Sequence, residues 1–209
     1  MGVVNTATKR GPGPVAVMRR RLATGAVLEV AQTADARRRL RLESAARSWA
    51  EHRGIPVPRV LESDPQGRWL VSEWIDAGRP AGDSYVDAAV AVAARLAAQP
   101  ELPAGTGGAS RWRAPRRSTL ERGLRVVAGG VPPRLWIGAR RQAWACDGPR
   151  VVSHGDFHPG NVLATTGGVA VVDWEFMSLA PRHSDLLRLW TVLPEPTDRD
   201  RLLGLLIDG

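Results

Sequence analysis

The sequence predicts an α+β fold of two lobes, in which a small antiparallel sheet with one helix precedes a larger, mainly helical part. Three observations support this prediction. The first third of the chain has the order strand, strand, helix, strand, strand, and most of the remainder has helical periodicity. Between them lies "DAGRPAG" at residues 76–82, whose glycines and proline suit a hinge. We therefore expect an N-terminal lobe at residues 1–76 and a C-terminal lobe at residues 77–209.

The composition is that of a globular protein with a buried core. The chain has 209 residues, of which 44% are apolar, and charge or glycine interrupts each apolar stretch before the length of about 20 residues that a membrane span needs. The N-terminal "MGVVNTATKRGPGP" lacks the apolar core of a signal peptide. The single cysteine, Cys146, cannot form an intrachain disulfide. We expect a cytoplasmic protein with no membrane partner.

The formal net charge of +8 raises the possibility of a nucleic-acid partner. The arginines are, however, spread along the chain, and no aromatic platform accompanies them, so we expect no nucleic-acid binding. A steep salt dependence of DNA or RNA binding would favour that rival reading. Lys9 is the only lysine. The sequence makes no prediction of the oligomeric state.

The N-terminal elements are predicted from alternation and turn chemistry. Strands are expected at residues 15–20 and 26–31, joined by a turn around Thr24 and Gly25. A helix should begin after Thr33, a good N-cap residue, and end before Gly54. The turn "DPQG" then separates two further strand-like runs.

The C-terminal elements are predicted in the same way. A buried helix is expected at residues 83–99 and a loop at residues 100–117. Three short strands should lie in the stretch "VVSHGDFHPGNVLATTGGVAVVDWEF", residues 151–176. Further helices are predicted at residues 118–128, 133–145, 183–193 and 197–207.

The stretch of residues 151–176 also contains the candidate chemistry. In "HGDFHPGN", Pro159 and Gly160 should form a tight turn that returns Asn161 to the neighbourhood of Asp156, and in "VAVVDWE" the second carboxylate, Asp173, ends a strand. A loop acid, an amide five residues later and a strand-end acid fit a phosphoryl-transfer site with one base and two magnesium ligands. The alternative is that these groups only satisfy turn and strand-end backbone.

The motifs "HGDFHPGNVL", "VAVVDWEF" and "SDLLRL" resemble the aminoglycoside phosphotransferase family, relatives of choline kinases and protein kinases. The resemblance implies a bilobal protein-kinase-like fold with a catalytic C-terminal lobe. It implies that Asp156 orients or deprotonates the acceptor hydroxyl and that Asn161 and Asp173 bind Mg²⁺. By the same matching, His154 braces the loop and Asp185 supports it from a following helix.

The resemblance extends to the N-terminal lobe through "RLESAARSWAEHRGIPVPRVL" and "RWLVSEWIDAG". It implies that this lobe binds ATP, or another nucleoside triphosphate, with Glu73, Trp74 and Ile75 as the hinge. The implied activity is transfer of the γ-phosphate to a hydroxyl of a small molecule.

One position departs from the family pattern. Where a strand lysine normally pairs with a helix glutamate, the chain has Glu29, although the helix partner Glu43 is present. Two facing carboxylates repel unless an arginine intervenes, and residues 19–21 of the preceding strand are arginines that could reach them. The alternative function is therefore a pseudo-kinase, a nucleotide-binding or interaction module with little turnover.

The acceptor is less well specified. Members of the family commonly continue with further helices around the acceptor, so the C-terminal lobe is expected to be short, either naturally or by truncation. A polycationic aminoglycoside would need an acidic cleft, which Glu195, Asp198 and Asp200 could supply against the positive net charge. His158 is interpreted as structural, because phosphoryl transfer gives it no evident task.

Overall fold

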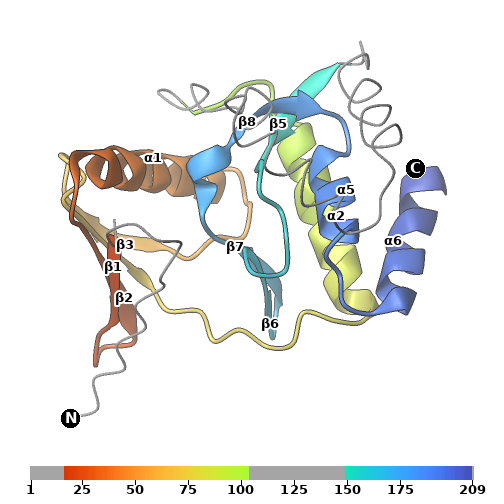
Figure 1. Ribbon diagram of the computed structural model, residues 1–209, viewed down its shortest axis with the longest axis horizontal. Helices are drawn as coiled ribbons and strands as arrows, with labels where there is room; N and C mark the ends of the chain where they lie inside the picture. The colour runs from red at the N-terminus through yellow and green to blue at the C-terminus, as the bar shows by residue number, and fades with distance from the viewer. Residues whose placement is uncertain (1–16, 104–148, 209) are drawn as a thin grey trace, which may run out of the picture.

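The computed structural model describes residues 17–103 and 149–208. The helices predicted at residues 118–128 and 133–145 lie outside these residues. Figure 1 shows the sheet-containing lobe on one side and the helices α2, α5 and α6 on the other, with β6 and β7 between them. Within the described ranges no helix has the length and apolarity needed to cross a bilayer.

The N-terminal lobe is built on a four-stranded antiparallel sheet. Its spatial order is β1-β2-β4-β3, so each of the two predicted strand pairs is a hairpin and the second strands of both hairpins meet in the centre. The four predicted strands are confirmed. Their bounds are β1 Val17–Arg21, β2 Ala26–Ala31, β3 Val60–Ser63 and β4 Trp69–Glu73.

Helix α1, Ala34–Glu51, packs against β2, β3 and β4 (Figure 1). It begins where the sequence predicts, because the hydroxyl of Thr33 accepts a hydrogen bond from the backbone N–H of Ala36 at 3.1 Å. It ends before Gly54, whose φ of +65° turns the chain away from the helix.

Each hairpin of the sheet turns on a glycine with positive φ. Gly25 lies between β1 and β2 with φ +77°, and Gly67 of the "DPQG" turn has φ +71°. The two differ in their surroundings. A Cβ on Gly25 would meet nothing within 4 Å, whereas one on Gly67 would lie 2.1 Å from the carbonyl oxygen of Arg37 in α1. The second turn is therefore pressed against the helix.

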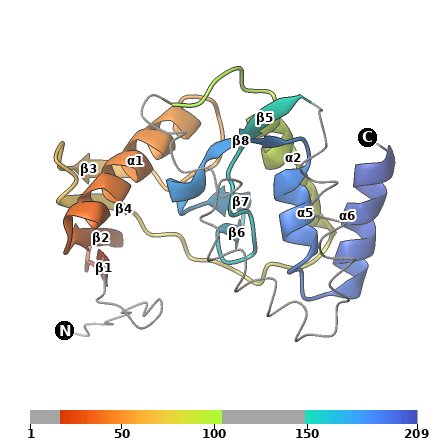
Figure 2. The same ribbon diagram turned by 45° about the horizontal axis from the view of Figure 1, so that its top comes forward.

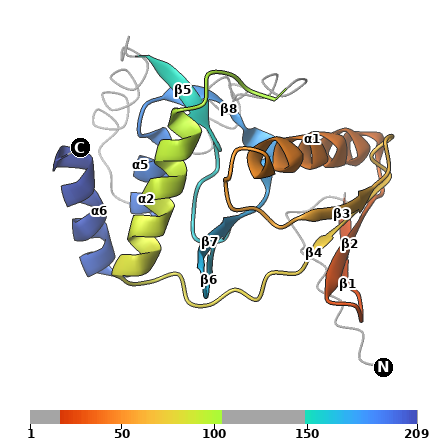
Figure 3. The same cartoon turned by 180° about the vertical axis from the view of Figure 1, so that it is seen from behind.

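An extended linker at residues 74–82 joins β4 to helix α2, Asp83–Ala97, and Figure 3 shows it running along one edge of the molecule. The lobe boundary proposed after Asp76 falls within this linker. Its far end is fixed by Asp198, whose two carboxylate oxygens lie 3.2 and 3.1 Å from the backbone nitrogen of Gly82. Since Gly82 precedes α2, this carboxylate fixes the start of the helix.

The C-terminal lobe contains two small antiparallel pairs. The strands are β5 Arg150–Ser153, β6 Val162–Thr165, β7 Gly168–Val171 and β8 Ser178–Pro181. The first three are confirmed, but the sequence prediction missed β8, which pairs with β5 (Figure 2). A four-residue segment ending in proline has no clear alternation, and its partner lies far away in the sequence.

The last two helices follow β8 and pack with α2. Helix α5 spans Ser184–Trp190 and is shorter than the predicted 183–193 at both ends. At its start, His183 adopts the left-handed conformation with φ +67° and so precedes the helix. Helix α6 spans Pro196–Asp208 and starts one residue before the predicted 197–207. A proline in the first helical turn is well tolerated.

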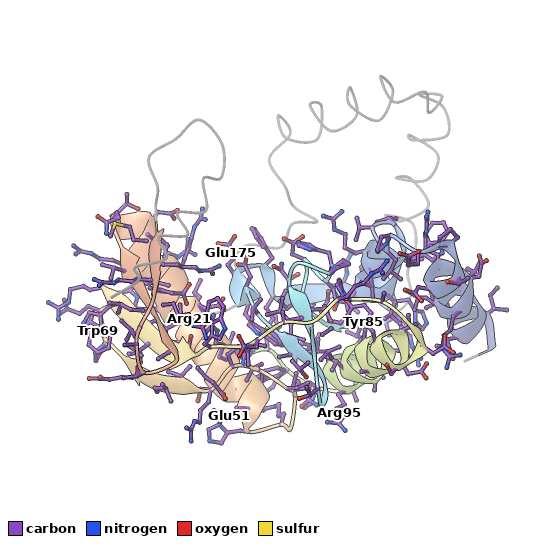
Figure 4. The ribbon with its side chains drawn as sticks, turned by 90° about the horizontal axis from the view of Figure 1, so that it is seen from below. Arg21, Glu51, Trp69, Tyr85, Arg95 and Glu175 are labelled. Carbon is purple, nitrogen blue, oxygen red and sulfur yellow. The ribbon has the colours of Figure 1, made fainter. Side chains whose placement is uncertain are left out.

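The core lies mostly in the C-terminal lobe, but the end of α1 belongs to it. Ala46, Ala50 and Ile55 pack in one cluster with residues of α2 and of β5 to β7. The backbone carbonyl of Pro56 accepts a hydrogen bond from Val171 at 2.8 Å. Inside the lobe, the Tyr85 hydroxyl donates to the Val162 carbonyl at 3.0 Å (Tyr85 is labelled in Figure 4). The two lobes are thus joined through α1 as well as through the linker.

The contrast between the two turn glycines is testable. Gly67→Ala should lower the free energy of unfolding by about 2–5 kcal/mol, because the left-handed backbone and the clash with the Arg37 carbonyl both act. Gly25→Ala carries only the backbone strain and should cost about 1–2 kcal/mol. Urea unfolding of both variants measures the difference, and equal losses would contradict the packing of the second turn against α1.

Candidate functional site

The loop between β5 and β6 is held by the carboxylate of Asp185, at the start of α5. One oxygen, Oδ1, accepts from the Ser153 hydroxyl at 2.8 Å and from the backbone N–H of Gly155 at 3.1 Å. The other, Oδ2, accepts from the backbone N–H of His154 at 2.8 Å. Asp185 is buried, so these charge-assisted bonds form out of water, where they are strong. Asp185 therefore lies where a loop support was predicted.

Gly155 brings the same loop close to the segment after β7. Its φ is +80°, and a Cβ on this residue would lie 2.2 Å from the backbone carbonyl oxygen of Phe176. Only glycine fits both constraints. The loop between β5 and β6 and the segment after β7 are therefore in direct backbone contact.

His154 fills the space beneath the loop. It is fully buried, its Nε2 lies 3.1 Å from the Val172 carbonyl, and its Nδ1 lies 3.4 Å from the backbone nitrogen of Asp156. These contacts fit the tautomer with the proton on Nε2. The ring meets Trp174 edge to face at 4.8 Å between centroids. His154 thus braces the loop on which Asp156 lies.

Asn161 is returned to Asp156 as the turn chemistry predicts. Its Nδ2 donates to the backbone carbonyl of Asp156 at 3.0 Å, and its backbone N–H donates to the His158 carbonyl at 2.8 Å. Because the amide nitrogen is bound to the loop, the side-chain oxygen Oδ1 is the atom that remains to face a cation.

Asp173 lies at the exit of β7 in the left-handed conformation, with φ 65° and ψ 62°. Its backbone N–H donates to Glu43 Oε1 at 3.2 Å, and the next one, of Trp174, donates to Glu43 Oε2 at 2.6 Å. A non-glycine residue in this conformation persists where its surroundings hold it, as they commonly do at functional sites. The helix glutamate therefore holds the strand-end acid through the backbone.

A second contact from α1 reaches the same segment. Arg39 Nη1 lies 3.1 Å from Oε2 of Glu175, which is labelled in Figure 4. The Glu175 side chain is only 12% exposed, so this pair is partly shielded from water. The sequence made no prediction for Glu175.

Arg47 lies between the carboxylates of Glu29 and Glu43, which were expected from the sequence to face each other. Its Nε donates to Glu43 Oε1 at 2.7 Å, and its Nη2 lies 3.5 Å from Glu29 Oε2. All three side chains are buried. Sequence reasoning missed Arg47, although its spacing of four residues from Glu43 on one helix was a usable signal.

Arg19 is the second cation of this cluster. It lies directly opposite Glu29 in the register of β1 and β2, and its Nε donates to Glu29 Oε1 at 2.5 Å. This confirms that an arginine of the preceding strand reaches Glu29. The cluster of Arg19, Glu29, Glu43 and Arg47 contains two positive and two negative groups, so the substitution at the strand position leaves no net charge in it.

The carboxylate of Asp156 lies between two basic groups. Arg188 Nη2 is 3.6 Å from Oδ1, and His158 Nε2 is 3.6 Å from Oδ2. Burial lowers the pKa of His158 below its ordinary value, and this effect outweighs the opposing charge of Asp156, while Arg188 lowers the pKa further. The second nitrogen of His158, Nδ1, accepts from the backbone N–H of Gly160 at 3.0 Å, which ties this histidine to the turn.

The predicted hinge begins at the end of β4. Glu73 is the last residue of that strand, and the backbone N–H of Trp74 donates to the Gly25 carbonyl at 3.1 Å. The guanidinium of Arg21, labelled in Figure 4, lies 4.4 Å from the centre of the Trp74 ring. Ile75 follows in the extended linker. Backbone and side-chain contacts thus fix the start of the linker to the β1–β2 hairpin.

The donor set of the site suits Mg²⁺. Within the described residues, no group of three or more histidine, cysteine or acidic side chains gathers as a self-sufficient metal site. Mg²⁺ does not require one, because it binds through one or two hard protein oxygens together with substrate phosphates and water. The carboxylate of Asp173 and the amide of Asn161 carry hard oxygens of that kind.

A separate cavity of about 370 Å³ lies behind the loop rather than at these acids. Ser153 and Asp185 contribute to its wall, but most of its lining is apolar and comes from α2, β5 and α6. The candidate acids Asp156 and Asp173 do not line it.

Two sequence comparisons relate the chain to known proteins. The profile of the phosphotransferase enzyme family matches residues 16–208. The aminoglycoside 3'-phosphotransferase of Streptomyces fradiae is 30% identical over 161 residues, with coverage of 66% of this chain and 59% of the relative. The chain thus spans less than two thirds of the length of that relative.

Solved structures show the same fold. An aminoglycoside-3'-phosphotransferase of type VIII superposes with a TM-score of 0.61 at 24% identity, covering 100% of this chain and 88% of that one. The streptomycin-ATP-APH(2")-IIa ternary complex superposes with a TM-score of 0.63 at 12% identity, covering 98% and 76%. These similarities confirm the predicted α+β bilobal kinase-like fold.

The role of Asp185 in holding the loop can be tested without any substrate. Asp185→Asn should lower the free energy of unfolding by about 1.5–3 kcal/mol, because an amide loses the charge and presents N–H groups to backbone donors. Amide hydrogen exchange at His154 and Gly155 should accelerate. Asp198→Asn is the matched control, since it loses a buried carboxylate that caps α2 instead. Equal exchange of the loop amides in both variants would contradict the assignment.

The environment of His158 predicts a pH dependence of stability. Its pKa is lowered in the folded protein, so the unfolded chain takes up this proton first as the pH falls below about 6.5. The folded state should therefore lose stability on acidification below that value. Thermal unfolding at pH 7.5 and 5.5 should show a larger decrease for the wild type than for His158→Gln. His52→Gln serves as the control for loss of an exposed imidazole, and identical decreases in wild type and His158→Gln would refute the prediction.

Proposed function

The chain belongs to the phosphotransferase enzyme family, and on that premise we propose that it transfers the γ-phosphate of ATP, or of another nucleoside triphosphate, to a hydroxyl of a small molecule. The observation that carries this proposal is that Asn161 is bonded to the backbone of Asp156, while the backbone of Asp173 is held by Glu43. Turn and strand-end chemistry alone does not require a glutamate from the other lobe. The proposal places the protein in the cytoplasm, where these nucleotides are available.

Asp156 is the proposed base. Its side chain is only 6% exposed, and the loop that carries it is fixed by Asp185 and His154. A base held in one position orients the acceptor hydroxyl and takes its proton as the bond to phosphorus forms. In the same displacement the bond between the γ-phosphorus and the bridging oxygen of the β-phosphate breaks, and the nucleoside diphosphate leaves with that electron pair.

Asn161 and Asp173 are the proposed ligands of Mg²⁺. When bound, the ion supplies neutralisation of the charge on the nucleotide phosphates. The protein contributes two hard oxygens. Asn161 is tied to the Asp156 carbonyl through its side-chain Nδ2, and Asp173 is tied to Glu43 through its backbone N–H. Glu73, Trp74 and Ile75 are the proposed hinge that contacts the nucleotide.

The acceptor class is left as a small hydroxylated molecule. Two of the acids that could form an acidic cleft have structural partners: Glu195 pairs with Arg79, and Asp198 binds the start of α2. Arg188 lies close to Asp156. These contacts weaken the case for a polycationic aminoglycoside as acceptor.

The alternative is a nucleotide-binding module with little turnover, and Glu29 is the observation that favours it. The surrounding charges argue for an active site, because Arg19 and Arg47 both contact Glu29 and compensate the missing lysine in charge. If the site had lost its lysine without any compensating change, Glu43 and Glu29 would face each other with no cation between them. Here Arg47 contacts both carboxylates. We therefore rank the active phosphotransferase first.

If Asp156 is the base, its substitution should reduce the rate of phosphate transfer without reducing the affinity for the nucleotide. Asp156→Asn should reduce phosphate transfer by at least about 100-fold, because general base catalysis typically contributes that much, while nucleotide affinity with Mg²⁺ stays close to the wild type. Transfer from radiolabelled ATP to a panel of hydroxylated compounds measures the first, and titration calorimetry the second. Unchanged turnover in the variant would remove Asp156 from the mechanism, and nucleotide binding without turnover in the wild type would favour the alternative function.

The ligand assignment predicts the opposite pattern for Asp173. Asp173→Ala should weaken nucleotide binding about 10- to 100-fold in the presence of Mg²⁺, the effect of losing one charge-assisted contact, and much less in EDTA. Asp200→Ala, an exposed acid on α6, is the control for loss of a negative charge. The assignment is wrong if both variants bind as the wild type does, or if the loss in Asp173→Ala is the same without Mg²⁺.

A further inference from the structure

The nucleotide site of a kinase needs a cation that contacts the phosphates. In this chain the β2 position that usually supplies this cation does not do so. In protein kinases a strand lysine, paired with a helix glutamate, has this task. Here that position is Glu29, which is buried and negative, and Lys9 is the only lysine of the chain. Among the residues that the structure describes, the candidates for this cation are the arginines near Glu29 and Glu43.

Arg19 meets the geometric requirements. It lies opposite Glu29 in the β1–β2 register, and opposite residues of an antiparallel pair project to the same face. Here that face is turned toward α1, because Glu29 contacts Arg47 of that helix. The Nε contact with Glu29 uses one of the five N–H donors of the guanidinium. The Arg19 side chain retains 41% exposure, whereas that of Glu29 retains 3%. Arg19 thus joins a buried anchor to a surface that a ligand can reach.

A chain of contacts leads from Arg19 to the segment of the proposed metal ligand: Glu29 contacts Arg47, Arg47 contacts Glu43, and Glu43 holds the backbone N–H of Asp173. Partial burial acts to lower the pKa of Arg19, but the carboxylates of Glu29, Asp173 and Glu43 together raise it above the ordinary value. These contacts place Arg19 on the same network as Asp173, beside which the phosphates of a magnesium nucleotide would lie under the proposed function.

The neighbouring arginines are less suitable. Arg47 is only 4% exposed, and its guanidinium contacts both Glu43 and Glu29. Arg21 stacks on Trp74 and lies 3.8 Å from Asp76, at the start of the linker. Arg20 alternates to the other face of β1. Of the three arginines of β1, Arg19 is therefore the one that projects to the same face as Glu29, is bonded to it and is still exposed to solvent.

We propose that Arg19 binds the phosphates of the nucleoside di- or triphosphate, and that Glu29 anchors Arg19. In this arrangement the strand position that usually carries the phosphate-binding lysine carries the anchoring carboxylate, and the cation lies on the neighbouring strand. The inference rests on the proposed function, because it assigns a residue within the same nucleotide site. A guanidinium held at Nε presents its other N–H groups in a fixed plane, which suits phosphate oxygens.

The test is calorimetric titration of the full chain with ADP and with adenosine in the presence of Mg²⁺. Arg19→Met should weaken ADP binding about 10- to 100-fold, the loss of a charge-assisted contact, and leave adenosine affinity unchanged. Arg20→Met is the matched control, because it removes the same charge from the same strand but from the opposite face. It should bind ADP as the wild type does.

The outcomes separate this inference from the proposed function. If the wild type binds neither ligand at millimolar concentration, and guanosine and GDP titrated in the same way do not bind either, both fail. If the wild type binds ADP and Arg19→Met binds it equally well, or if Arg19→Met and Arg20→Met lose the same affinity, only the Arg19 assignment fails. A parallel loss of adenosine affinity would also overturn it, because the effect would then not concern the phosphates.

A second variant covers the possibility that Arg19→Met does not fold, which its thermal unfolding curve will show. Glu29→Gln keeps the shape of the anchor and removes its charge, so Arg19 is retained but less firmly held. It should weaken ADP binding by a smaller factor than Arg19→Met and leave adenosine binding unchanged. Wild-type ADP affinity in Glu29→Gln would contradict the role of Glu29 as anchor.

Discussion

The carboxylate of Glu43 is the interaction on which the arrangement of the site depends. It accepts hydrogen bonds from the backbone of Asp173 and Trp174 in one lobe and from Arg47, which continues to Glu29 in the sheet of the other lobe. Bonds to a buried charge contribute about 1.5–3 kcal/mol each, and removal of one partner leaves the others unsatisfied in a dry environment. The Glu43 side chain therefore links the helix, the sheet and the end of β7 directly.

A second carboxylate acts in the same way from the opposite side. Asp185 binds the backbone N–H groups of His154 and Gly155, as Glu43 binds those of Asp173 and Trp174. In both cases the acid proposed for chemistry lies on a segment whose peptide groups are held by another, buried acid. Backbone bonds fix the direction of a chain, so in both cases a buried acid positions the segment that carries the proposed base or metal ligand.

Local chemistry made much of this structure predictable. Thr33 and Gly54 mark the ends of α1, and the "HPGN" turn returns Asn161 to Asp156, because each signal acts within a few residues. The missed features depend on distant partners. Strand β8 is defined by its pairing with β5, and Arg188 reaches Asp156 only because α5 packs beside the loop. Arg47 had a local signal in its spacing from Glu43, but its contact with Glu29 depends on the packing of α1 on the sheet.

The exchange of charge around Glu29 has a consequence for chemical detection. Reagents that identify nucleotide-binding proteins by acylating a lysine beside the phosphates would have only Lys9 to modify in this chain. The cluster around Glu29 instead contains guanidinium groups, which remain protonated throughout the physiological range and are poor nucleophiles for such reagents. A survey based on lysine labelling would therefore miss proteins built in this way, even where their sites are fully occupied.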